Sequence, residues 1–246
     1  MTDQAADNAT AGEAEAAARP GHAVGIWAII LLGLGYGALH WLSGDRAGAS
    51  VLWWLDPLLL LGFAAGWWAR SRRPGWWPRL RLSGVAAAVV FIGGSWLAGM
   101  LYELSLRTGP TGFGGMHPDT ATSFVLAQGH YLPFAVGGWW LARRYGYGAA
   151  GVFWTGALAS LYEMVIAGFP AIAGAPQFWL LIPLILGYYL YVYALILAFP
   201  LLFLDERSLW AAAPRSIGAW GKVWRGVLFG LLYWVVFVGW AGLIGV

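Results

Sequence analysis

Residues 177–204 read QFWLLIPLILGYYLYVYALILAFPLLFL, a stretch without a single charged side chain. The hydrocarbon core of a bilayer is about 30 Å thick, and an α-helix crosses it in roughly 20 residues. The stretch is therefore long enough to span a membrane. Tyr188, Tyr189, Tyr191 and Tyr193 fall near its middle, where their hydroxyl groups need hydrogen-bond partners. We expect these tyrosines either to line a path for a flat apolar ligand or to pack inside a bundle.

The rest of the chain has the same character. Hydrophobic residues make up 60% of the 246 positions and charged residues only 10%, which excludes a water-soluble domain of this length. Pairs of small residues four apart, such as Gly33 and Gly37, allow helices to approach closely. We therefore predict an all-α membrane protein, a compact bundle of seven transmembrane helices within residues 21–246. The other six predicted spans are 22–43, 51–69, 84–106, 122–142, 149–168 and 223–245.

The basic residues predict the orientation of this bundle. Seven spans place the two termini on opposite sides, and the connections on one side hold twelve Lys and Arg residues. The other side holds two, Arg46 and Arg107. Because cytoplasmic loops carry the excess of basic residues, we expect the N-terminus in the cytoplasm and the C-terminus outside. The expected location is the cell (inner) membrane, crossed several times.

Several classes of protein do not fit the remaining features. Residues 1–20 are rich in alanine and acid without apolar periodicity, so we expect a disordered cytoplasmic tail rather than a signal peptide. The absence of cysteine excludes disulfides, thiolate metal ligands and a cysteine nucleophile. The basic residues are spread over short connections and form no basic face, which argues against a nucleic-acid partner.

Three acidic residues, Asp56, Glu103 and Glu163, lie inside the predicted spans, all toward the outer leaflet. Ionisable groups in hydrocarbon are costly and usually mark functional sites. Glu103 and Glu163 each end a Leu-Tyr-Glu tripeptide, which suggests a repeated helical hairpin. At similar depth lie the other polar side chains of the predicted site, Gln128, His130 and Tyr131 in the fourth span and Tyr102 and Tyr162 beside the glutamates.

These residue types suit two kinds of chemistry. Glu103, Glu163 and His130 have the groups for acid–base catalysis, with Tyr102, Tyr131, Tyr162, Gln128 and Asp56 as substrate-binding side chains. Carboxylate and imidazole also suit a metal ion, for which Glu103, Glu163, His130 and His117 are candidate ligands, with His40 a weaker one. Alternatively, the carboxylates pair with Arg107 or with tyrosine hydroxyls and only hold the helices together.

The expected function follows from a polar site inside an apolar bundle. We expect the protein to bind or modify a lipid-soluble small molecule, such as an isoprenoid, carotenoid, quinone or lipid, in an outer-leaflet cavity. Two alternatives remain open. One is a proton-coupled small-molecule transporter, for which the inner half offers few polar residues. The other is a non-catalytic subunit of a membrane complex, packed against a partner protein or a second copy. The sequence leaves undecided whether the protein is an enzyme.

Overall fold

The computed structural model describes residues 20–43, 55–72, 79–108, 116–117, 119–165, 176–210 and 217–245. Within these ranges the structure is helical and has no strand, which confirms the predicted all-α class. The predicted tail lies outside the described residues except for Pro20, where the first described helix begins. The elements are α2 (Pro20–Ser43), α3 (Leu55–Arg72), α4 (Gly84–Thr108), α5 (Thr120–Tyr145), α6 (Ala149–Ala159), α7 (Leu161–Glu163), η4 (Pro176–Leu181), α9 (Ile182–Ala198), η5 (Phe199–Leu202), η6 (Glu206–Leu209) and α10 (Ala219–Leu243).

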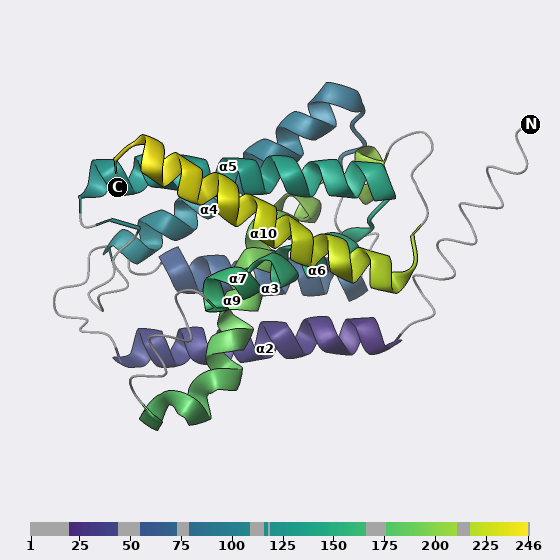
Figure 1. Ribbon diagram of the computed structural model, residues 1–246. Coiled ribbons are helices and arrows are strands. Elements are labelled where there is room, and N and C mark those ends of the chain that lie inside the picture. The colour runs from purple at the N-terminus through teal and green to yellow at the C-terminus, as the bar shows by residue number, and fades with distance from the viewer. Residues whose placement is uncertain are drawn as a thin grey trace, which may run out of the picture.

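Helix α9 forms the centre of the molecule and runs obliquely between the other long helices (Figure 1). Every residue from 191 to 198 is buried. Glycines make the crossings possible, because a Cβ at Gly33 of α2 would stand 2.6 Å from the Cβ of Tyr191. A Cβ at Gly156 of α6 would stand 2.6 Å from the carbonyl oxygen of Tyr193. Small residues thus let α2 and α6 approach α9 closely, as in other helix interfaces of membrane proteins.

The outer surface of the bundle is apolar. Large aliphatic side chains such as Leu31, Val85 and Leu232 are 65%, 79% and 64% exposed. Soluble monomers rarely expose so many adjacent apolar groups, whereas hydrocarbon accommodates them. Three helical segments, Gly84–Leu106, Trp179–Leu202 and Trp220–Leu243, are long and apolar enough to cross a membrane. These three segments therefore support the membrane class that the composition predicts.

The fifth predicted span is not one continuous helix. Helix α6 ends at Ala159, and α7 resumes at Leu161 for a single turn. At the break, both the backbone N–H and the side-chain hydroxyl of Ser160 donate to the carbonyl oxygen of Ala157, at 3.2 and 2.8 Å. A serine hydroxyl that bonds back to its own helix competes with the regular hydrogen-bond ladder, which explains the one-residue interruption of the helix. Glu163 lies directly after this break.

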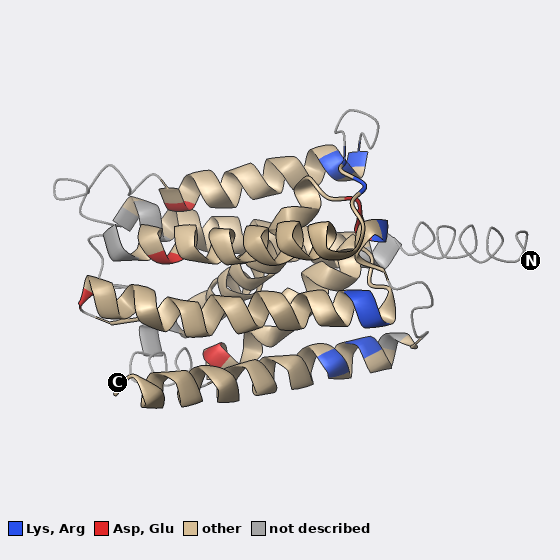
Figure 2. Ribbon diagram, turned by 90° about the horizontal axis from the view of Figure 1, so that it is seen from above, with Lys and Arg blue, Asp and Glu red and all other residues tan. Residues whose placement is uncertain are grey.

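The charged residues are distributed unevenly along the bundle. Figure 2 shows the described Lys and Arg residues gathered at one end. The start of α2 lies toward this end and the end of α10 lies at the opposite end (Figure 1). We call the two ends the basic end and the distal end.

The crossing of α6 and α9 can be tested by substitution. Gly156→Ala would place a methyl group against the backbone of α9, 2.6 Å from Tyr193 O and 2.9 Å from Ala194 Cα, and backbone cannot rotate away. We expect a loss of roughly 1–3 kcal/mol from overpacking, seen as a lower unfolding temperature in detergent. The control is Gly93→Ala on α4, where a Cβ would meet nothing within 4 Å. It should be neutral or stabilising by up to about 1 kcal/mol, since alanine favours the helix. Equal effects of the two substitutions would contradict the tight crossing.

Candidate functional site: a buried carboxylate, phenol and imidazole cluster

Four helices contribute one polar side chain each to the middle of the bundle. His130 comes from α5, Glu163 from α7, Tyr193 from α9 and Tyr233 from α10. Tyr193 Oη donates to Glu163 Oε2 and lies 2.8 Å from His130 Nε2. Tyr233 Oη lies 2.5 Å from His130 Nε2, 2.7 Å from His130 Nδ1 and 3.2 Å from Tyr193 Oη. We call these four residues the central cluster.

The protons that each side chain carries decide which atoms donate and which accept in these bonds. A tyrosine hydroxyl has one proton, so Tyr193, which donates to Glu163, accepts from His130 Nε2–H. Tyr233 Oη contacts both ring nitrogens and the Tyr193 hydroxyl, so its single proton has two acceptors within reach, His130 Nδ1 and Tyr193 Oη. The bonds thus form a series that links Tyr233 and His130 through Tyr193 to the carboxylate. Such a series can pass a proton along its length without moving any helix.

Helix α5 presents His130 at a weakened point of the helix. Pro133 has no backbone N–H, so the carbonyl of Gly129 lacks its usual partner in the helix. Gly129 also gives space to α10, because a Cβ there would lie 1.9 Å from Trp240 Cδ1. The indole of Trp240 in turn donates to the carbonyl of Val125 at 2.9 Å. These contacts bring α10 against α5, with Tyr233 beside the His130 ring at a centroid distance of 4.9 Å.

Glu103 lies in a separate polar group nearer the distal end. The side chain is 1% exposed, and its Oε1 accepts from Ser123 Oγ at 2.6 Å and from Met116 N at 3.0 Å. Ser123 sits in the first turn of α5, which Asp119 caps by accepting from Thr122 N at 2.8 Å. Glu103 thus ties the end of α4 to the start of α5. The structure does not bond it directly to Glu163.

Asp56 and Tyr102 belong to a third group, around α9. Tyr102 Oη donates to Tyr188 Oη at 3.1 Å. Asp56, in the first turn of α3, has one buried carboxylate oxygen, Oδ1, without a hydrogen-bond partner among the described residues. An isolated carboxylate oxygen in an apolar interior is costly. Oδ1 of Asp56 therefore differs from Glu103 Oε1 and Glu163 Oε2, each of which has a protein partner.

The remaining predicted side chains lie around these groups. Tyr131 is buried and meets the His130 ring edge to face at 4.8 Å. Gln128 accepts from Trp96 Nε1 at 2.8 Å and donates to Phe124 O at 3.2 Å, so it bonds within the α4 and α5 pair. Tyr162 packs against Gly230 of α10, where a Cβ would lie 2.8 Å from its Cδ2. Of the predicted set, then, only His130 and Glu163 share the central cluster.

The predicted metal site has limited support. Among the residues that the structure describes, no three His, Cys, Asp or Glu side chains lie close enough together to hold a metal ion. His117 Nδ1 accepts from the backbone N–H of Asp119 at 3.0 Å, so that nitrogen is already engaged. The side chains of His40 and Arg107 lie outside the described residues. The proposed pairing of a glutamate with Arg107 is therefore not tested.

Two members of the central cluster are not among the predicted site residues. For Tyr193 the sequence predicts either a ligand path or packing within the tyrosine-rich sixth span. For Tyr233 it predicts no role. Each has the ordinary sequence environment of an aromatic residue in an apolar helix. A search for polar side chains that share one depth in different spans would have included both.

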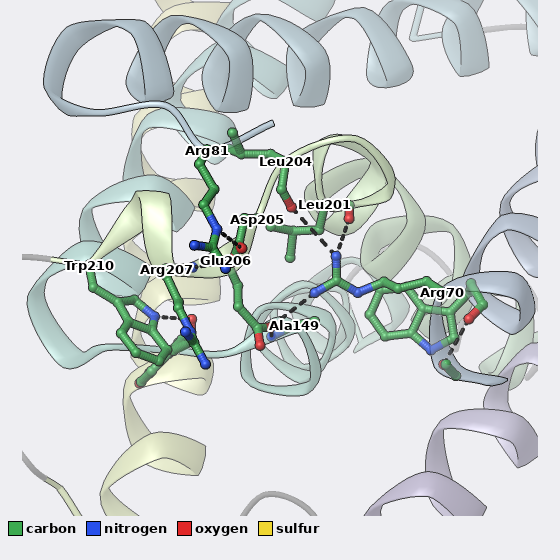
Figure 3. Close-up of polar contacts among 12 residues, drawn as sticks. Arg70, Arg81, Ala149, Leu201, Leu204, Asp205, Glu206, Arg207 and Trp210 are labelled. Carbon is green, nitrogen blue, oxygen red and sulfur yellow. Dashed lines mark hydrogen bonds and ion pairs between the residues drawn. The ribbon is translucent and has the colours of Figure 1, made fainter. Parts of the chain in front are cut away.

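A second polar cluster, also missed, lies at the basic end. Arg70 Nη2 lies 3.1 Å from Glu206 Oε2, and Arg81 Nε lies 3.1 Å from Asp205 Oδ2. Figure 3 shows Arg70 reaching from the end of α3 toward the carbonyl oxygens that follow α9, with Glu206 beside Ala149. Glu206 Oε2 accepts from the N–H of Ala149, the first residue of α6, where a negative charge is favoured.

Comparisons with protein-family models, with curated proteins and with solved structures found no match to this chain. The function is therefore argued below from the site alone.

The two ion pairs of the basic end should differ in strength. The Arg70 side chain is 8% exposed and the Arg81 side chain 76%. Arg70→Gln would leave Glu206 and a carbonyl without their charged partner, so we expect a loss on the order of 3 kcal/mol in unfolding free energy. Arg81→Gln is the matched control and should cost under about 1 kcal/mol, as exposed pairs do. Chemical unfolding in detergent, followed by circular dichroism, measures both. A larger effect at Arg81 than at Arg70 would refute this ranking.

Proposed function

We propose that the chain is a seven-span membrane protein that binds or modifies a lipid-soluble small molecule at a proton-exchanging site, the central cluster. The observation that carries the proposal is the series of hydrogen bonds that links Tyr233 and His130 through Tyr193 to Glu163. Bundle packing alone does not require four titratable side chains from four helices to meet in an apolar interior. Such groups in membrane proteins are commonly proton relays or ligand sites.

In this proposal the two ends of the series have different roles. Glu163 is the proton acceptor or donor, and Tyr193 and His130 carry the proton between it and Tyr233. The Tyr233 hydroxyl, on the helix that is the least buried of the three candidate membrane-crossing segments, is the group that meets the small molecule. A lipophilic molecule reaches it from the bilayer between α5 and α10. Tyr131, beside His130, keeps that ring in place.

The topology is part of the proposal. In the part of the chain that the structure describes, each predicted span contains helix, and the described basic residues gather at one end (Figure 2). These features support an N-terminus in the cytoplasm, a C-terminus outside and a location in the cell membrane. Glu103 then lies nearer the outer surface than the central cluster does.

A proton-coupled transporter is the second candidate, and one observation favours it. The central cluster joins four separate helices, and Tyr233 is the contribution of α10. A movement of α10 relative to α9 would break or make the bond between Tyr233 and His130. Coupling a proton to such a movement is how a carboxylate drives transport. Passive proton flux into liposomes that hold the purified protein separates this candidate from the first, because an enzyme or binding protein need not conduct protons.

Substitution of Glu163, or of Tyr193, whose phenol donates to it, tests the proposed function. We expect a lipophilic molecule to copurify with the wild-type protein in mild detergent, detected by absorption and by mass spectrometry of a solvent extract. Glu163→Gln and Tyr193→Phe should each reduce the bound amount about tenfold, the cost of a lost hydrogen bond to a charged group. Tyr145→Phe, outside the cluster, should not change it. Equal loading in all four proteins at equal folded yield would refute the site. If no molecule copurifies with the wild type, the ligand-binding proposal fails.

The orientation can be tested because the chain has no cysteine. Single cysteines at Ser71, at the basic end, and at Ala121, at the distal end, provide one label site on each side; both positions are exposed. In intact cells a membrane-impermeant maleimide should modify Ala121→Cys and leave Ser71→Cys unmodified until the membrane is opened. The reverse pattern would invert the proposed topology, and equal labelling at both sites would argue against opposite sides.

A further inference from the structure

A groove runs along the lipid-facing side of α3 and is unrelated to the central cluster. Its floor on α3 is made of small residues, among them Gly62 and Ala65, and Phe199 and Phe203 form the opposite wall. Its volume is about 500 Å³, within the roughly 300–1,000 Å³ usual for ligand sites. A Cβ at Gly62 would meet nothing within 4 Å, so the floor is open at that point. We call this feature the α3 groove.

The two ends of the α3 groove differ in polarity. Its lining is apolar from Leu58 to Ala69. At the end nearer the basic end, Trp68 is 50% exposed, as expected of an indole at the headgroup level. Arg72 follows one helical turn after Trp68, so it shares that side of α3, and it is exposed. The groove therefore has one cationic end and a long apolar remainder.

The cationic end and the apolar remainder of the groove favour one kind of ligand over others. A helix from a second copy would present apolar side chains along its whole length and gain nothing from a cation at one end. An amphiphile with one negative headgroup and an acyl chain matches both parts, because the chain covers the small residues while the phosphate meets Arg72. We propose that the α3 groove binds an anionic phospholipid of the leaflet that borders the basic end. This inference does not depend on the function of the central cluster.

The binding test uses defined lipids and full-length protein stripped of lipid in detergent. Dioleoyl phosphatidylglycerol and dioleoyl phosphatidylcholine have the same acyl chains and differ in headgroup charge. Titration of each lipid, followed by the unfolding temperature, gives an apparent Kd. We expect tighter binding of the anionic lipid to the wild type. Arg72→Gln should raise the Kd for that lipid about fivefold, the usual effect of one basic side chain near a charged lipid. The Kd for phosphatidylcholine should not change.

A second variant tests the apolar part separately. Gly62→Phe fills the groove, and because a Cβ there meets no neighbour, it should fold normally and weaken both lipids. Gly93→Phe on α4, also without a neighbour within 4 Å, is the matched control and should bind both as the wild type does. An unchanged headgroup preference in Arg72→Gln, or wild-type binding by Gly62→Phe, would overturn the proposal. So would a shift of Gly62→Phe from dimer to monomer in light scattering, which would assign the groove to a second copy.

Discussion

The interior of this protein depends on one constraint: polar side chains in an apolar bundle must satisfy one another. An unpaired polar group in such surroundings costs several kcal/mol. Glu163, His130, Tyr193 and Tyr233 meet this constraint together, because each accepts or donates where its neighbour needs a partner. No pair of these side chains would satisfy all the polar atoms involved. The cluster therefore joins four helices in one arrangement.

The path of α9 makes that cluster possible. Tyr193 reaches both His130 and Glu163 only because α9 passes through the middle of the bundle rather than along its edge (Figure 1). Passage through the middle requires close approach to α2 and α6, which Gly33 and Gly156 permit. Glu163 follows the short break at Ser160 by three residues and accepts from Tyr193. The close packing of helices around α9 thus also positions the side chains of the central cluster.

The two ends of the bundle are held by different chemistry. At the basic end, Arg70 and Glu206 join α3, α6 and the segment after α9 through a mostly buried ion pair and bonds to backbone (Figure 3). At the distal end, Glu103 joins α4 to α5 through Ser123 and a backbone N–H. Near the central cluster, α10 is held by aromatic packing, by the close crossing of Trp240 on Gly129 and by hydrogen bonds from Trp240 to Val125 O and between Tyr233 and His130.

The sequence by itself determined that the protein is all-α and suited to a membrane. Apolar runs of this length predict membrane helices whatever other helices they pack against. It also identified His130 and Glu163 as buried polar groups, since their cost in hydrocarbon is local. The proposed seven spans and their orientation still rest on the sequence pattern of basic residues. Only the tertiary structure decided the partners. Tyr193 and Tyr233 are 63 and 103 positions from His130 and resemble many aromatic residues of this chain until the helices are packed. Likewise, Glu103 and Glu163 share a tripeptide but bond to different groups, because a hydrogen bond depends on which helix lies opposite, and that is a property of packing rather than of local sequence.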